Sequence, residues 1–144
     1  MVHKDTISLL KECNAGVKMG VTSIDEVLDN VKNDTLLKLL TENKEEHQQL
    51  GSKIHELLNK YGESGKEPSA MAKGMSWVKT NVMLNMHDSD HTIADVMTDG
   101  CNMGVKSLHR YLNKYEAADQ KSKGIAKDLI ALEQRLTQEL CSFL

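Results

Sequence analysis

Cys13, His47 and Cys101 are the side chains of this sequence whose types and positions could do chemistry. Each interrupts a row of aliphatic residues at helical spacing, so each is expected to point into a core. An imidazole and two thiolates could hold a soft metal such as zinc or copper(I). The alternative is structural, because free cysteine packs as a small hydrophobe and Asn43, one turn before His47, can satisfy the imidazole. We favour the structural interpretation and retain the metal site as the alternative.

A second pair of histidines lies in the stretch MLNMHDSDH. His87 and His91 are four residues apart, so on a continuous helix they would share a face and could share a metal ion. Asp88, Ser89 and Asp90 lie between them, and these residue types commonly cap a helix. We therefore expect a helix boundary here and regard a metal site at this pair as the weaker interpretation.

The elements that position these residues begin with an antiparallel helical hairpin over residues 5–62. Asp5 and Thr6 offer N-caps for the first helix. A very short turn follows that helix, so the second helix must lie antiparallel beside it. In that arrangement Gly20 is level with His47 and leaves room for the imidazole ring. The apolar rows of the two helices include Leu10, Cys13, Val17, Ile24 and Val27, then Leu36, Leu40, Leu50, Ile54 and Leu57.

A second hairpin is expected over residues 90–144, after a crossover segment at 63–89. Two glycines and the only proline lie in YGESGKEPS and end the first hairpin. Ser69 to about Met86 then reads as a shorter helix, long enough to carry the chain back along the bundle. The predicted fold class is all-α: a ferritin-like four-helix bundle of two antiparallel hairpins joined by a short crossover helix. It forms a single domain over residues 1–144.

A hexapeptide is nearly repeated, as CNAGVK at residues 13–18 and CNMGVK at residues 101–106. Each copy lies in the first helix of a predicted hairpin, with its cysteine on the inward row. Because register, row and topology agree, the two hairpins look like duplicated halves.

Paired helical hairpins with a long crossover are the ferritin-like plan. The stretches GVKMG, HQQLG and IADVMTDGCNMGVKS resemble a group of small bacterial ferritin-like proteins of unknown function. The resemblance extends from about Leu9 to Leu140. It implies a fold, and no particular activity follows from it.

Ferritin-like oxidases hold two irons with a Glu from each of two helices and a Glu-x-x-His from each partner helix. In this sequence Lys44 stands three residues before His47, and the last helix contains no histidine. The inward rows of the first helix and of the helix after residue 90 contain no acidic residue. We therefore expect no working carboxylate di-iron site, since coordination depends on ligand identity.

Composition excludes several classes of function. The net charge is −3 with acids and bases interleaved, so no basic face is available for nucleic acid. No stretch reads as a secretory signal or a membrane span. The three cysteines lack CxxC spacing, which is typical of free thiols in a reducing, cytoplasmic setting. Aromatic residues make up only 3% of the chain, so the core must be aliphatic.

These observations favour a non-enzymatic helical bundle with a scaffold or interaction role, whose partner is another protein or a second copy of the chain. This interpretation requires no cofactor and assigns no catalytic residue. The alternative is a metal-binding or redox protein that holds a soft transition metal with inward Cys and His residues.

Overall fold

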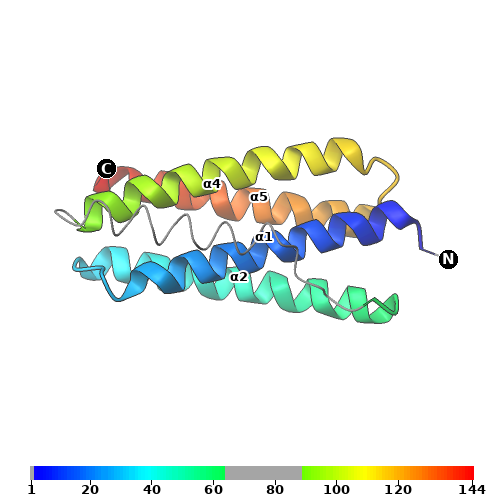
Figure 1. Ribbon diagram of the computed structural model, residues 1–144, viewed down its shortest axis with the longest axis horizontal. Coiled ribbons are helices and arrows are strands. Elements are labelled where there is room, and N and C mark those ends of the chain that lie inside the picture. Colours follow the sequence, from blue (N-terminus) through cyan, green and yellow to red (C-terminus); the bar gives the residue numbers. More distant parts are fainter. Residues whose placement is uncertain (1, 64–88) are drawn as a thin grey trace.

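The computed structural model describes residues 2–63 and 89–144, which form four α-helices and a short 3-10 helix. They are α1 (Lys4–Leu28), α2 (Asp34–Lys60), α4 (Ser89–Lys114), α5 (Gln120–Leu140) and η1 (Cys141–Phe143). The predicted all-α class and four-helix bundle are confirmed (Figure 1). The predicted crossover helix, residues 69–86, lies outside the described residues. None of the helices described is long and apolar enough to cross a membrane.

Local sequence signals account for the ends of α2. The side chain of Asn33 accepts hydrogen bonds from two backbone N–H groups of the first turn, which would otherwise lack partners. At the other end Gly62 has a φ of 73°, a left-handed conformation that glycine adopts without strain. The N–H of Glu63 then donates to the carbonyl of Leu58 at 2.9 Å, closing a Schellman motif. The glycine after Tyr61 therefore terminates the helix as the sequence predicts.

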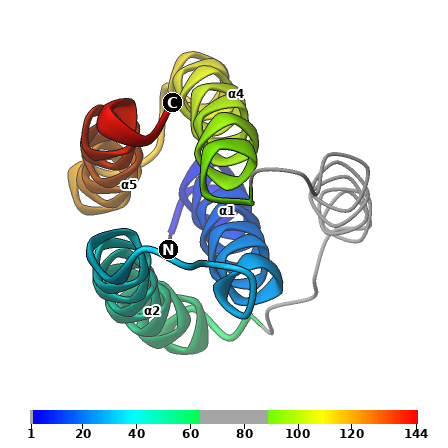
Figure 2. The same ribbon diagram turned by 90° about the vertical axis from the view of Figure 1, so that its left-hand side faces the viewer.

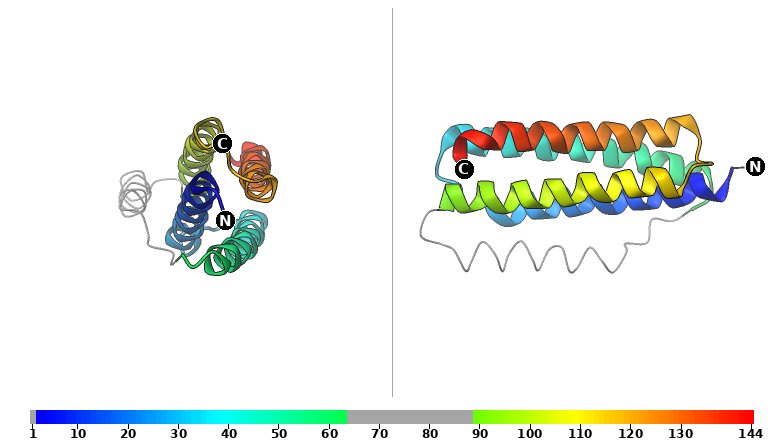
Figure 3. Two further views of the ribbon diagram at one scale, coloured as in Figure 1. Left: turned by 90° about the vertical axis from the view of Figure 1, so that its right-hand side faces the viewer. Right: turned by 90° about the horizontal axis from the view of Figure 1, so that it is seen from above.

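The four helices lie side by side, with α1 packed mainly on α2 and α4 mainly on α5. Ion pairs join α1 to α2 and to the residues just after it in opposite order along the chain: Asp25 pairs with Lys44 of α2, and Lys11 pairs with Glu63. End views show α1 next to α4 and α2 next to α5 (Figures 2 and 3). The C-terminal end of α2 and the N-terminal end of α4 lie at opposite ends of the bundle (Figure 1).

The core consists of two aliphatic clusters that follow one another along the bundle. The first, at the end where α1 begins, includes Leu9, Cys13, Val17, Leu50, Ile54, Leu108, Leu129 and Leu132. The second, at the other end, includes Ile24, Val27, Leu36, Leu40, Ile93, Cys101, Leu136 and Leu140. On every helix a short interval separates the two clusters, and the functional candidates described below lie at that level.

The start of α1 is tied to the turn between α4 and α5. The carboxylate of Asp5 accepts from the N–H of Ala117 at 3.1 Å, and the hydroxyl of Thr6 accepts from the N–H of Asp119 at 2.8 Å. The prediction that Asp5 and Thr6 cap α1 is therefore wrong. The N-cap is His3, whose Nδ1 accepts from the N–H of Asp5 at 3.0 Å. Because α1 begins at Lys4, the two predicted caps lie in its first turn, from which they reach the neighbouring turn.

Asp90, in the first turn of α4, holds the turn between α1 and α2 in a similar way. Its two carboxylate oxygens accept from the N–H of Lys32 at 2.9 Å and of Asn33 at 3.0 Å. Charge-assisted bonds of this kind are the stronger ones, although these are solvent-accessible. We expect Asp90→Ala to lower the free energy of unfolding by about 1 kcal/mol in urea denaturation. The matched change at exposed Asp95 should stay within about 0.5 kcal/mol of the parent, and equal losses at both positions would contradict this account.

Candidate functional site

A layer of four residues, one from each helix, separates the two aliphatic clusters. It contains Gly20 of α1, His47 of α2, Gly104 of α4 and Glu133 of α5. The two side chains in this layer are almost fully enclosed, with His47 1% and Glu133 7% exposed. A titratable pair therefore lies between the two aliphatic clusters, where its burial cost must be offset by specific interactions.

The orientation of the imidazole is fixed by its own helix. Nδ1 of His47 lies 2.9 Å from the carbonyl oxygen of Asn43, one turn earlier. A carbonyl oxygen can only accept, so Nδ1 carries a proton and Nε2 is the nitrogen that faces Glu133. The prediction that Asn43 satisfies one nitrogen of the imidazole is confirmed, and the group that does so is the backbone carbonyl rather than the side-chain amide.

His47 and Glu133 form a close, buried pair whose side chains are not directly hydrogen-bonded. Nε2 and Oε1 are 3.7 Å apart, which exceeds the normal length of such a bond. Nε2 of His47 and Oε2 of Glu133 are both buried and lack a hydrogen-bond partner. Two neighbouring buried side chains therefore each keep one polar atom without a partner, which is an uncommon arrangement in a packed interior.

The two glycines of the layer provide the space for this pair. A Cβ added at Gly20 would lie 2.8 Å from Cδ2 and from Nε2 of His47, so the predicted room for the imidazole is confirmed. A Cβ added at Gly104 would lie 3.0 Å from Cδ of Glu133 and would collide with Oε2. Glycine inside a helix costs about 1 kcal/mol relative to alanine. Close contact with a buried polar side chain explains why glycine occupies these two helical positions despite that cost.

Electrostatics favour one proton shared within the pair. Burial raises the pKa of the Glu133 carboxyl above its usual range, and the neighbouring His47 acts in the opposite direction. An ionised carboxylate facing a lone pair on Nε2 would be unfavourable in so dry an environment. The stable states therefore place a proton either on Nε2, giving an ion pair, or on Glu133, giving a neutral pair.

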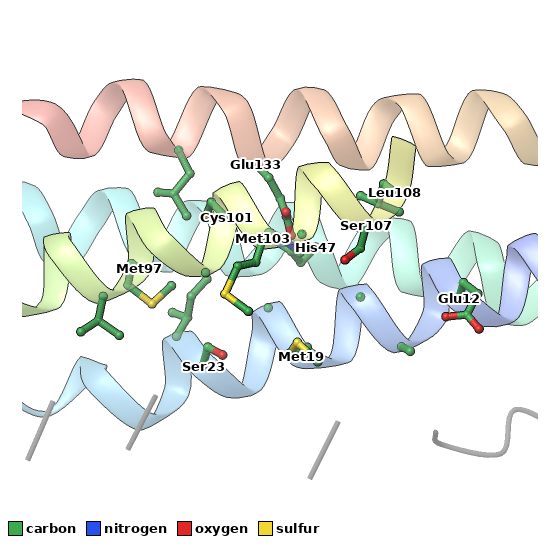
Figure 4. Close-up of a pocket in the computed structure, with 18 of the residues that line it drawn as sticks. Glu12, Met19, Ser23, His47, Met97, Cys101, Met103, Ser107, Leu108 and Glu133 are labelled. Atoms are coloured by element: carbon green, nitrogen blue, oxygen red, sulfur yellow. Dashed lines mark ion pairs between the residues drawn. The ribbon is translucent and has the colours of Figure 1, made fainter. Parts of the chain in front are cut away.

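The pair forms part of the wall of a cavity of about 480 Å³ between α1 and α4 (Figure 4). Figure 4 shows His47 and Glu133 next to each other, with Met19, Met97 and Met103 around the same space. Other lining residues are Glu12, Ala15, Gly16, Gly20, Ser23, Ile24, Val96, Gly100, Cys101, Gly104, Ser107, Leu108, Tyr111 and Leu136. The size is within the range of pockets that bind small molecules, about 300–1,000 Å³.

The three residues of the predicted metal site are placed differently from one another. All three are buried, as expected, and His47 and Cys101 line the cavity. Cys13 belongs to the aliphatic cluster on the other side of the layer from Cys101. Within residues 2–63 and 89–144, no three Cys, His, Asp or Glu residues are grouped so that they could hold a metal ion.

Of the second predicted pair, His87 and His91, only His91 lies among the described residues. His91 is exposed in the first turns of α4, and His87 lies outside the described residues. The predicted helix boundary in this stretch agrees with the start of α4 at Ser89.

Glu133 is the site residue that the sequence analysis missed. Gln134 and Arg135 follow it directly, and a glutamate beside such residues usually faces solvent. The available signal was its register, because Glu133 follows Leu129 by four residues and precedes Leu136 by three. This spacing places it on the buried face of α5.

Thiol reactivity should distinguish the buried cysteines from the exposed one. Burial raises the pKa of Cys13 to about 12, and burial together with Glu133 raises the pKa of Cys101 even further. Both thiols thus remain protonated and enclosed at pH 8, whereas Cys141 is exposed. We expect an aromatic disulfide reagent to label one thiol per chain rapidly at pH 8, and all three only after denaturation. Rapid labelling that persists in Cys141→Ser would contradict the buried placement.

Comparisons of this chain with protein-family models, with curated proteins and with solved structures find no match.

Proposed function

We propose that this chain is a non-enzymatic binding protein with the ferritin-like plan, in which a buried Glu–His pair replaces a carboxylate di-iron centre. The antiparallel contacts of α1 with α2, and the start of α4 at the end of the bundle opposite the end of α2, support that plan. As partner we propose another protein or a second copy of the chain. A reducing, cytoplasmic setting would suit its three free cysteines.

The observation that carries the proposal is the composition of the central layer. A ferritin-like oxidase needs a Glu from each of the two helices that face its Glu-x-x-His helices. Here α1 and α4 contribute Gly20 and Gly104 at the level of the pair, and glycine has no side-chain donor atom. A metal-ligating side chain at either glycine position would collide with the ring of His47 or the carboxylate of Glu133.

The other two helices each retain one half of a Glu-x-x-His motif. On α2, His47 is present and Lys44 stands three residues before it. On α5, Glu133 is present and Leu136 stands three residues after it. One imidazole and one carboxylate satisfy each other's charge, but they do not supply the six ligands of a di-iron centre.

An iron-oxidation assay tests the absence of this enzymatic activity. Fe(II) is added to the protein in air, and the initial rate of oxidation is compared with that of Fe(II) in buffer. We expect no acceleration beyond that of an equal concentration of the Glu133→Gln variant. A rate that saturates with iron, that is lost in Glu133→Gln and that is kept in exposed Asp99→Asn would overturn the proposal.

The alternative, a soft-metal or redox protein, is supported by the presence of His47 and Cys101 in one cavity. Zinc or copper(I) would then raise the melting temperature, and Cys101→Ala would abolish the rise. On our proposal, zinc or copper(I) shifts the melting temperature of the parent protein by no more than it shifts that of the Cys101→Ala variant.

A further inference from the structure

We propose that the cavity between α1 and α4 binds a small amphipathic amine, with its ammonium group between Glu133 and His47 and its hydrocarbon part against the methionines. This inference rests on the proposed binding function and names the class of ligand.

The polar end of the cavity has the hydrogen-bond acceptors that an ammonium group requires. Because Nδ1 of His47 donates to Asn43, a neutral imidazole presents a lone pair at Nε2. Oε2 of Glu133 is a second buried acceptor without a partner, and the two side chains line the same cavity. An ammonium group has only donors, so it can satisfy both atoms at once and takes the place of the proton that the pair otherwise shares.

The charges around the cavity favour a cation over an anion. The titratable groups that line it are Glu12 on α1, His47 on α2, Cys101 and Tyr111 on α4, and Glu133 on α5. Among the lining residues that the structure describes there is no lysine or arginine. A carboxylate ligand would therefore meet two carboxylates and no permanent positive charge, in an environment where like charges repel strongly.

The rest of the cavity suits a flexible hydrocarbon chain. Met19, Met97 and Met103 contribute to its wall, and methionine adapts its shape to irregular apolar ligands. Gly16 and Gly100 also line the cavity and project no side chain into it. At Gly100 an added Cβ would meet nothing within 4 Å.

Three six-carbon probes that differ only in their polar group test this inference: hexylamine, hexanol and hexanoate. Binding is followed at pH 7.5 by the shifts of the methionine methyl groups in two-dimensional NMR spectra and by the melting temperature. We expect hexylamine to shift the signals of the cavity methionines and to bind at least ten times more tightly than either other probe. Equal binding of hexylamine and hexanol, or preferred binding of hexanoate, would overturn the proposal.

Two variants localise the effect. Glu133→Gln removes the negative charge and keeps the size, and it should weaken hexylamine binding at least tenfold. Gly100→Leu fills the cavity and leaves the pair intact, and it should also weaken binding at least tenfold. Exposed Asp99→Asn is the control for loss of one negative charge and should bind as the parent does.

The outcomes separate this inference from the proposed function. Unchanged affinity in Glu133→Gln or in Gly100→Leu, each shown to be folded by its circular dichroism, would contradict the amine site alone. Saturable iron oxidation that depends on Glu133 would contradict the proposed function, whatever the amine does.

Discussion

Replacing His47 with alanine is expected to lower the free energy of unfolding by about 3 kcal/mol at pH 8, measured by urea denaturation. The change removes the only charge-complementary partner of Glu133 seen among the described residues and leaves a carboxyl group that is 7% exposed. It also opens a cavity where a fully buried ring had been. Both effects act in the same direction, so this should be among the most damaging single changes in the bundle.

The double variant His47→Ala/Glu133→Gln isolates the contribution of the carboxyl group. Burial raises the pKa of Glu133, so between the unfolded and folded pKa values the folded state binds the proton more tightly. Stability associated with that proton is complete at low pH and is lost as pH rises through the folded pKa. The double variant should therefore be more stable than His47→Ala by at least about 1 kcal/mol at pH 8, and the difference should shrink toward pH 5. A difference that grows toward pH 5 would contradict a buried Glu133.

Gly20→Ala is expected to destabilise the protein, although alanine is the better helix former. The new methyl group would lie 2.8 Å from Nε2 of His47, and neither the helix backbone nor the enclosed ring can easily move away. Overpacking of this kind costs about 1–3 kcal/mol, which exceeds the gain of about 1 kcal/mol in helix propensity. We expect a net loss of up to about 2 kcal/mol in urea denaturation.

Gly100→Ala is the matched control, because its added methyl group meets nothing within 4 Å. The propensity gain is then unopposed, and we expect stabilisation by about 0.5–1 kcal/mol. In a His47→Ala background the cost of Gly20→Ala should disappear, since the ring that it touches is absent. Equal effects of the two glycine changes in the parent protein would show that the close contact at Gly20 does not exist.

The inward position of His47 and the role of Gly20 could be read from the sequence. Both depend on helical periodicity and on a short turn, which fix the register of two adjacent helices. The burial of Cys13 and Cys101 followed from the same pattern. These features depend on one helix or on two helices joined by a short turn, so the spacing of residues along each helix is enough to predict them.

The partner of His47 could not be identified in the same way. Glu133 is far from His47 in sequence. The two side chains meet only because α2 packs on α5 with a particular alignment along the bundle axis. The same applies to Asp90, whose carboxylate binds a turn from the other half of the chain. Contacts that depend on how separate helices are aligned leave little trace in periodicity, and a single glutamate on an amphipathic helix is read as solvent-facing by default.

The most direct test of the account is elemental analysis of the protein purified without a histidine tag, from cells grown in iron- and zinc-replete medium, under anaerobic conditions. We predict far less than one equivalent of iron, zinc or copper per chain, with the same content in His47→Ala. Near-stoichiometric metal that is lost in His47→Ala would contradict the central claim, because the buried pair would then be part of a metal centre.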